Sequence, residues 1–168
     1  VLLFTGALTV AAQEHIEDAD AKYAADLLKP GTEAPDFVVD SVKNRSLSYY
    51  RGAYVVLDFW ASWCPDCRKD IPKVQEIDSL YRDKVAVIGV SFDTNKDAWQ
   101  QCIKKNKMYW QQFSELKKWK KETEVDRKYR VNWIPTMYLI DPEGKIVLGT
   151  VMVEKMKAKL EELDKAGK

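Results

Sequence analysis

The pattern of apolar and polar positions divides the chain into alternating strands and helices. Two near-continuous apolar runs, 54–60 and 85–92, predict central strands buried on both faces. After Pro65 the apolar side chains recur every three or four positions, which predicts a helix. A second helix is expected over 95–106. A C-terminal helix follows, with these residues directed inward: Val153, Met156, Leu160 and Leu163.

The remaining pattern predicts strands near both ends of the domain. A short strand over 35–40 opens it, and a strand over 136–141 leads through a tight turn into a return strand over 145–151. Residues 107–132, rich in lysine and aromatic side chains, predict one or two short helices with irregular links. The fold class is therefore α/β, with a central mixed β-sheet flanked by helices.

The chain divides into a short N-terminal extension and one domain. Residues 1–12 are apolar and uncharged and end in small residues, as expected for the remnant of a signal peptide or membrane anchor. Twelve residues are too few to span a bilayer, which needs roughly 20. Residues 13–33 are polar and helix-prone over 18–28, and we predict a lead-in segment outside the core. The domain itself is expected over 34–168.

Composition narrows the possible chemistry. The 168 residues carry a net charge of +1, so no charge excess indicates nucleic acid or anionic lipid as a partner. One histidine, His15, and three cysteines are too few for a typical zinc site and leave little scope for a Ser–His–Asp triad. No metal or other cofactor is expected, and the reactivity of cysteine becomes the main candidate chemistry.

Cys64 and Cys67 form the clearest reactive group. Cys64 directly follows a predicted buried strand and begins a predicted helix, whose N-terminus stabilises a thiolate. Pro65 suits the first helical position, where its missing N–H costs nothing. With one helical turn between them, one sulfur can attack a substrate disulfide and the other can resolve the mixed disulfide. Cys64 is expected to be the exposed attacker and Cys67 the shielded resolving thiol.

Two further residues fit this chemistry. Asp58 lies inside an apolar strand, where a low dielectric disfavours its charged form. It is a candidate acceptor for the proton of Cys67; the alternative is a solvated carboxylate at the sheet edge. Pro135 stands at the start of a buried strand, which is tolerable with a cis peptide bond or as a plain first strand residue.

Together these features resemble the thioredoxin superfamily. The segment 58–67 (Asp-Phe-Trp-Ala-Ser-Trp-Cys-Pro-Asp-Cys), Pro72 in the following helix and Ile134-Pro135-Thr136 occur in the family's order, and the match covers about residues 34–166. The resemblance implies a thioredoxin-like fold, a Cys64–Cys67 redox disulfide and Asp58 as the buried acid. It also implies that a disulfide substrate is bound by the following residues: Trp63, Pro65, Asp66, Ile134 and Pro135.

The Ala-Pro-Asp-Phe opening at 34–37, the insertion around 95–125 and the hairpin at 139–145 resemble the TlpA/ResA-like branch of exported reductases. This implies a reductase that acts on exported proteins on the extracytoplasmic (periplasmic) side. Cytochrome c maturation is one process that such a reductase serves. The implied partners are disulfide-containing proteins and an upstream electron donor such as a membrane thiol carrier. The sequence specifies neither these partners nor the oligomeric state.

Two features depart from cytoplasmic thioredoxins. Asp66 stands between the cysteines, and its negative charge opposes thiolate formation at Cys64, which favours a reducing potential. Gly89 takes the place of the lysine that partners the family's buried acid, provided that Asp93 aligns with the aspartate ending the corresponding strand. Asp58 would then carry out proton transfer without that lysine.

Three alternative functions remain compatible with parts of the sequence. A peroxiredoxin shares the opening motif, but no Pro-x-x-x-Thr/Ser-x-x-Cys pattern precedes Cys64 or Cys67. A disulfide-donating oxidase or isomerase would carry an inserted helical domain for which the gap between Phe92 and Trp133 is short. A redox-inert binding module is the non-enzymatic alternative.

For three other features of the sequence we predict packing or surface roles, with no part in the chemistry. Cys102 is expected to be a small buried hydrophobe, with a regulatory thiol as the alternative. The lysines around Trp119 predict a solvated helix face, with a partner-docking patch as the alternative. Trp133 is expected either to line the site or only to pack against neighbouring side chains.

Overall fold

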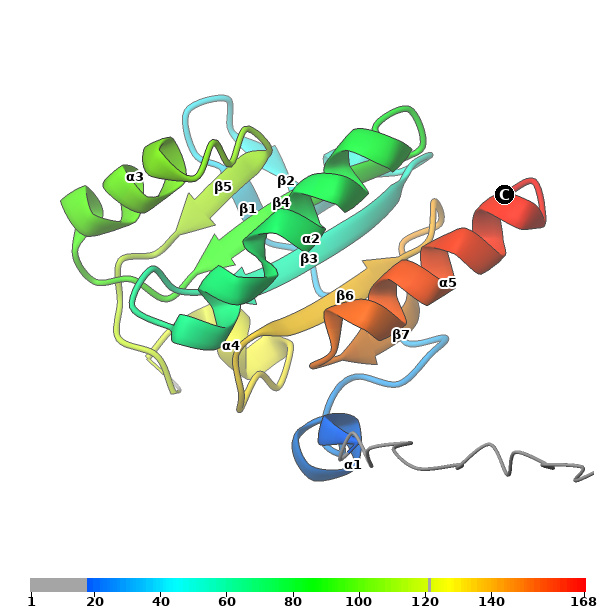
Figure 1. The fold of residues 1–168 in the computed structure, drawn as a ribbon, viewed down its shortest axis with the longest axis horizontal. Coiled ribbons are helices and arrows are strands. Elements are labelled where there is room, and N and C mark those ends of the chain that lie inside the picture. Colours follow the sequence, from blue (N-terminus) through cyan, green and yellow to red (C-terminus); the bar gives the residue numbers. More distant parts are fainter. Residues whose placement is uncertain (1–17, 121) are drawn as a thin grey trace, which may run out of the picture.

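The computed structural model describes residues 18–120 and 122–168, so the predicted signal or anchor remnant at 1–12 lies outside the described part. The domain is built on a five-stranded sheet of order β5-β4-β3-β6-β7 (Figure 1). Its strands are β3 (Tyr54–Trp60), β4 (Val85–Ser91), β5 (Gln111–Ser114), β6 (Thr136–Ile140) and β7 (Ile146–Thr150). Strands β3, β4 and β5 run parallel, whereas β6 and β7 are antiparallel to their neighbours. The predicted mixed sheet is confirmed.

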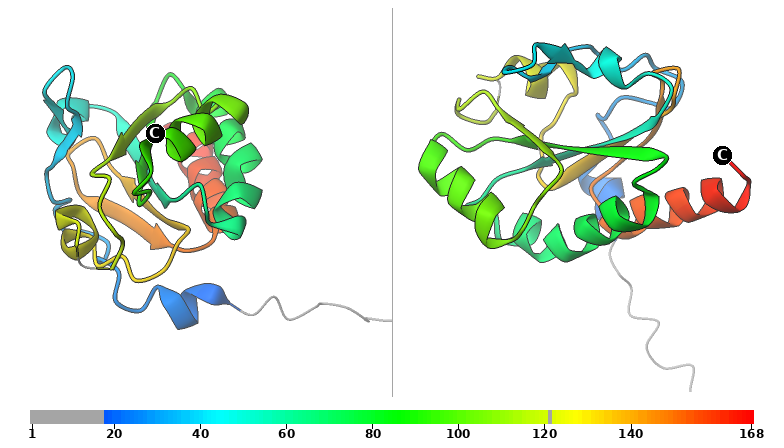
Figure 2. Two further views of the ribbon diagram at one scale, coloured as in Figure 1. Left: turned by 90° about the vertical axis from the view of Figure 1, so that its left-hand side faces the viewer. Right: turned by 90° about the horizontal axis from the view of Figure 1, so that it is seen from above.

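Helices cover both faces of this sheet. Helices α2 (Pro65–Tyr81), α3 (Lys96–Lys105) and α5 (Val153–Lys165) lie on one face (Figure 2). The other face carries the short helix α4 (Glu124–Lys128), the hairpin of β1 (Val38–Asp40) and β2 (Arg45–Ser46), and the 3₁₀ turn Leu47–Tyr50. Because β3 is covered on both sides, all but its first residue are buried, as the apolar run predicted.

The prediction for residues 107–132 was incomplete. The segment contains the edge strand β5 in addition to the short helix α4. Strand β5 pairs in parallel with β4 over 88–91, and each of its residues is only partly buried. A half-buried edge strand of sequence Gln-Gln-Phe-Ser lacks the apolar run that identified the central strands.

The lead-in segment also differs from expectation. Helix α1 (Ala19–Tyr23) covers only part of the helix-prone stretch, and the chain after it enters the core. Leu27 and Leu28 are buried in the main apolar cluster, and the Leu28 N–H donates to the Tyr138 hydroxyl at 3.0 Å. The expectation that this segment lies outside the core was wrong, because Leu27 and Leu28 pack into the apolar core next to β6 and β7.

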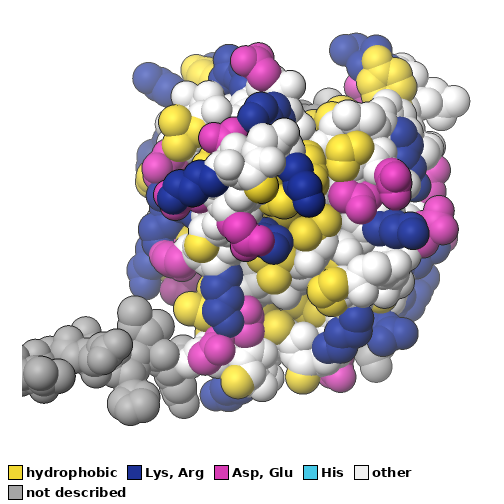
Figure 3. Space-filling model, turned by 90° about the vertical axis from the view of Figure 1, so that its right-hand side faces the viewer, with side chains coloured by type: hydrophobic (Ala, Val, Ile, Leu, Met, Phe, Trp, Pro, Cys, Tyr) yellow, Lys and Arg dark blue, Asp and Glu magenta, His cyan; other side chains and the backbone are white. Residues whose placement is uncertain are grey.

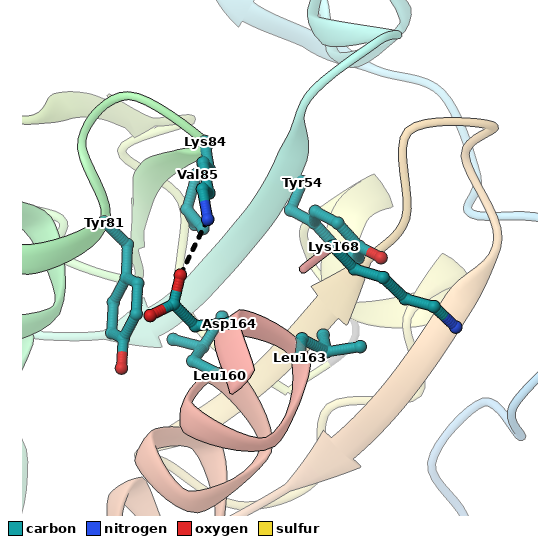
Figure 4. A pocket seen from close by; sticks show the side chains of 8 residues that line it. All are labelled: Tyr54, Tyr81, Lys84, Val85, Leu160, Leu163, Asp164 and Lys168. Atoms are coloured by element: carbon teal, nitrogen blue, oxygen red, sulfur yellow. Dashed lines mark hydrogen bonds and ion pairs between the residues drawn. The ribbon is translucent and has the colours of Figure 1, made fainter. Parts of the chain in front are cut away.

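The end of the described domain where β3 and β4 begin has a mixed surface and one small hollow. Figure 3 shows lysine, arginine, aspartate and glutamate side chains intermixed on the face that includes this end. A shallow hollow there, lined by Tyr54, Tyr81, Leu160 and Leu163 and crossed by the Lys84–Asp164 ion pair, encloses only about 10 Å³ (Figure 4). Among the described residues, no helix is both long and apolar enough to cross a membrane.

Candidate active site

The two cysteines lie where β3 passes into α2. Cys64 is the N-cap of α2, Pro65 occupies its first turn, and Cys67 follows one turn later. The Cys67 N–H donates to Cys64 Sγ at 3.1 Å, so the N-terminus of the helix is directed at this sulfur. Cys64 and Cys67 are joined by a disulfide, with their Cα atoms 5.3 Å apart. This arrangement supports a reversible dithiol–disulfide cycle.

The exposure of the two sulfur-bearing residues differs from the prediction. In this oxidised state Cys64 is 5% exposed and Cys67 4%, so neither stands out as the accessible one. The loop opposite covers them: Cys64 Sγ lies 3.9 Å from the carbonyl oxygen of Ile134, and the Ile134–Pro135 peptide bond is cis. The structure therefore brings together the two sequence-predicted segments, which are 70 residues apart.

Asp58 is buried beneath α2. It lies in β3 with 5% of its surface exposed, and no side-chain hydrogen bond satisfies its carboxyl group within the described residues. Burial raises the pKa of Asp58 to about 7, and the negative charge of Asp70 adds to the shift. The alternative of a solvated carboxylate at the sheet edge is wrong, because β3 is the central strand.

Asp70 is a second acidic residue near Asp58, and no sequence pattern predicted it. It lies on α2 one turn after Cys67, and burial raises its pKa as well. Lys73 Nζ stands 3.8 Å from Asp70 and also binds Glu154 of α5. An ion-pair network thus leads from the neighbourhood of Asp58 to the surface between α2 and α5.

Asp93 holds the loop that precedes Cys64. This buried residue follows β4, and its carboxylate accepts from the Ser62 N–H at 2.9 Å, from the Ser62 hydroxyl and from the Ser91 hydroxyl at 2.5 Å. Several donors on one carboxylate make a rigid anchor. The parallel register also places Gly89 beside Asp58, in agreement with the predicted absence of a lysine partner.

Charged side chains around the helix start are arranged asymmetrically. Asp66 is exposed and pairs with Lys69 at 3.3 Å, whereas Arg68 donates to the carbonyl oxygen of Ser62 at 3.1 Å. Lys69 therefore screens Asp66, but Arg68 is engaged with the loop. An exposed pair of this kind is worth little energy, so the charge of Asp66 is only partly offset.

An aromatic stack connects the core to the rim of the site. Trp63 is 52% exposed and its ring centroid lies 6.1 Å from that of Trp119. Trp119 stacks on Phe92, which in turn stacks on Phe59 of β3. The sequence predicted that Trp119 is an anchoring aromatic on a solvated face, whereas the structure places it next to Trp63, which precedes Cys64.

The lysines around Trp119 lie on an irregular segment. Lys117, Lys118 and Lys120 are exposed there, and the expected helix face is absent from the described part of 115–122. Lys120 Nζ lies 5.1 Å from the centroid of the Trp119 ring. Trp133, by contrast, stacks on Tyr23 at 3.8 Å, so it packs against the lead-in segment.

Cys102 lies apart from the disulfide. It is half-buried at the edge of the core, and burial raises the pKa of its thiol. It borders a hollow of about 350 Å³ together with Ser62, Arg68 and Lys105. In the described ranges, no group of three or more histidine, cysteine or acidic side chains is arranged to hold a metal ion.

The sequence of this chain is similar to those of known thioredoxin-like proteins and thiol-disulfide oxidoreductases. The model of the AhpC/TSA family matches residues 30–148. The thioredoxin-like protein YneN of Bacillus subtilis is 32% identical over 144 residues, which cover 80% of each chain. The thiol-disulfide oxidoreductase ResA of Bacillus cereus is 31% identical over 134 residues, covering 78% of this chain and 74% of ResA.

Solved structures agree with the sequence relatives. The thioredoxin domain of a thiol-disulfide oxidoreductase from Bacteroides vulgatus superposes with a TM-score of 0.71 at 30% identity, covering 81% of this chain and 98% of that domain. A putative thiol:disulfide interchange protein DsbE from Chlorobium tepidum gives a TM-score of 0.70 at 27% identity, covering 82% and 97%. The predicted thioredoxin-like fold is confirmed.

Proposed function

Because this chain belongs to the AhpC/TSA family and has the thioredoxin-like fold, we propose that it is a thiol–disulfide oxidoreductase that reduces protein disulfides through Cys64 and Cys67. The observation that carries the proposal is the Cys64–Cys67 disulfide at the N-terminus of α2. A helix N-terminus stabilises the Cys64 thiolate, which is the nucleophile that attacks a substrate disulfide in the reduced protein.

The proposed cycle begins with the reduced protein. The Cys64 thiolate attacks one sulfur of a substrate disulfide, which forms a mixed disulfide and releases the first substrate thiolate. Asp58 then accepts the proton of the Cys67 thiol, since its pKa of about 7 keeps part of it ionised near neutral pH. The Cys67 sulfur attacks Cys64 Sγ, the second substrate thiolate leaves, and two electrons have passed to the substrate. An upstream thiol donor restores the dithiol.

The reducing direction is tested by the reduction potential of the pair. We expect a value below about −220 mV, the range of proteins that deliver electrons to disulfides. The measurement equilibrates the Cys102→Ser protein in glutathione buffers, so that only Cys64 and Cys67 report. A value above about −150 mV would make the protein a disulfide donor or isomerase.

The charge of Asp66 supplies a matched variant for this measurement. Asp66→Asn removes a negative charge beside Cys64 and stabilises the thiolate, so the potential should rise by roughly 10–20 mV. Glu143→Gln changes an exposed charge in the β6–β7 turn and serves as the control. Equal changes of the potential in the two variants would show that the charge of Asp66 has no specific effect on the Cys64–Cys67 pair.

The proposed substrate groove lies between the cysteines and the loop opposite. Trp63, Pro65 and Asp66 form one side, and Ile134 and Pro135 form the other. An extended substrate segment would pair with the backbone of Ile134, whose carbonyl oxygen already lies 3.9 Å from Cys64 Sγ. Trp119 extends this groove through its contact with Trp63.

Trp119→Ala tests that extension. We expect kcat/KM for a folded protein disulfide to fall roughly 3- to 10-fold through KM, the amount an aromatic pair contributes. Reduction of oxidised glutathione should be unchanged, because so small a substrate does not reach Trp119. Tyr109→Ala, which alters a side chain that is 82% exposed just before β5, is the control. Equal losses with both substrates would indicate damage to the cysteine site instead.

We further propose that the protein works outside the cytoplasm on exported proteins. The support is the signal-like pattern of residues 1–12 and the resemblance to exported reductases. Apocytochromes c are one substrate class that this resemblance implies, and a membrane thiol carrier is the corresponding donor.

A further inference from the structure

Helix α1 contributes no buried residue to the core of the domain. It lies outside the five-stranded sheet, below it in Figure 1, and none of its five residues is buried. A helix of this length is unstable by itself, because nucleating one turn costs more than the turn returns. Contacts with the rest of the domain must therefore hold α1 in place, and they indicate what it does there.

Two anchors fix α1 and the turn after it on the domain. The Asp20 carboxylate accepts hydrogen bonds from the Thr150 hydroxyl and from the Val151 N–H, both at 2.8 Å, and pairs with Lys155 of α5 at 2.9 Å. Beyond the helix, Leu28 is buried in the main apolar cluster. A side chain that lies between these anchors is therefore held at a fixed place relative to the sheet.

Tyr23 lies between the two anchors and stacks on Trp133. The ring centroids are 3.8 Å apart and the ring planes are inclined by 15°. Trp133 directly precedes Ile134, whose carbonyl oxygen lies 3.9 Å from Cys64 Sγ. The lead-in segment thus contacts the cis-proline loop one residue before the backbone group that faces the cysteine.

The first part of the cis-proline loop has few other supports. The Val131 N–H donates to the carbonyl oxygen of Asp126 at 2.9 Å, and the Asn132 amide donates to the Asp26 carboxylate at 3.4 Å. Val131 and Asn132 also border a hollow of about 440 Å³, so this part of the loop is open on one side. Among the described aromatic rings, Tyr23 is the one in contact with Trp133.

We propose that Tyr23 is a positioning residue for substrate binding: through Trp133 it holds the cis-proline loop where the backbone of Ile134 can pair with an extended segment of the substrate. This inference rests on the proposed reduction of protein disulfides. Binding groups must be held close to their productive geometry, and a displacement of about 1 Å is costly. Because Tyr23 acts through the loop, it should affect binding of the polypeptide and leave the sulfur chemistry unchanged.

Tyr23→Ala is the first test, and alanine keeps the helical propensity of α1. We expect KM for a folded protein disulfide to rise roughly 3- to 10-fold, the amount an aromatic pair contributes, with kcat unchanged. Tyr23→Phe retains the stacked ring and should restore KM. Reduction of hydroxyethyl disulfide, which has no peptide groups to pair with Ile134, should be unchanged, as should the reduction potential of the cysteine pair.

Tyr49→Ala is the matched control. Tyr49 is 58% exposed and packs edge-on against Tyr50, with ring centroids 5.4 Å apart. This pair lies shortly before β3 begins, whereas Cys64 follows the end of β3. The variant therefore loses an aromatic pair far from the cysteines and should keep the KM of the unmodified protein. An equal rise of KM in both variants would indicate a general loss of stability and would overturn the proposal.

A double-mutant cycle tests whether Tyr23 acts through Trp133. In Tyr23→Ala/Trp133→Ala the rise of KM should be no larger than the larger of the two single effects, because each substitution removes the same contact. Additive effects would mean that the two aromatic side chains act independently, which contradicts the proposal.

Hydrogen exchange separates this inference from the proposed function. The amides of 131–136 should exchange faster in Tyr23→Ala than in the unmodified protein or in Tyr49→Ala, and those of α2 should not differ. If the unmodified protein does not reduce the protein disulfide, the proposed function fails, and the exchange rates still decide whether Tyr23 holds the loop. If reduction proceeds but Tyr23→Ala leaves either KM or the exchange of the loop unchanged, the inference about Tyr23 alone is refuted.

Discussion

Cys64→Ser should abolish the reduction of protein disulfides, with a loss of at least about 1000-fold in kcat/KM. A serine hydroxyl at the N-terminus of α2 stays protonated at neutral pH, whereas a thiol there ionises readily. The helix, the cis-proline loop and Asp58 all remain, so the loss measures the nucleophile alone. Turnover is followed as thiols released from a disulfide-containing protein.

Cys67→Ser should behave differently from Cys64→Ser. The Cys64 thiolate still attacks the substrate disulfide, but no second thiol resolves the product, so a covalent complex accumulates and is seen by mass spectrometry under non-reducing conditions. Cys102→Ser is the control and should retain full turnover, since Cys102 lies on α3 apart from the disulfide. Activity retained by Cys64→Ser would favour the redox-inert binding module.

The central strands and the helix α2 were predictable because the apolar pattern of each sequence reflects which of its faces are buried. A strand covered on both faces must be apolar throughout, as 54–60 and 85–91 are, and α2 repeats its apolar residues with helical periodicity. Strand β5 was missed because an edge strand that is half-buried on each face tolerates polar residues such as Gln111 and Gln112. Its identity depends on its pairing with β4, which no local pattern specifies.

The same distinction applies to the candidate site. Cys64, Pro65 and Cys67 act together within one helical turn, so their spacing already describes their geometry. Asp93 and Trp119 reach the site only through the tertiary arrangement, from the end of β4 and from the irregular segment after β5. Gly89 indicated from the sequence that Asp58 has no lysine partner, and the strand register, which places the two residues side by side, agrees with this.

Asp58→Asn should make the protein more stable than the unmodified chain above pH 7. The pKa of Asp58 is about 7 in the folded state, against about 3.9 for an unfolded aspartate. The folded state therefore holds a proton that the unfolded chain has lost between these values, and stability falls as the pH rises through this window. Over about three pH units the loss amounts to about 4 kcal/mol, and asparagine removes it.

The measurement is urea unfolding of the oxidised protein from about pH 3 to pH 8. Near pH 3, below both pKa values, Asp58 is protonated in the folded and the unfolded state, so the two proteins should have similar free energies of unfolding; the difference should grow toward pH 7 and then level off. Asp83→Asn, which alters an exposed carboxylate after α2, should follow the unmodified protein. Parallel curves for Asp58→Asn and the unmodified protein would mean that Asp58 ionises normally in the folded state. In that case Asp58 would lack the property that suits it to accept the proton of Cys67, because an acid with an ordinary pKa is a weak base at neutral pH.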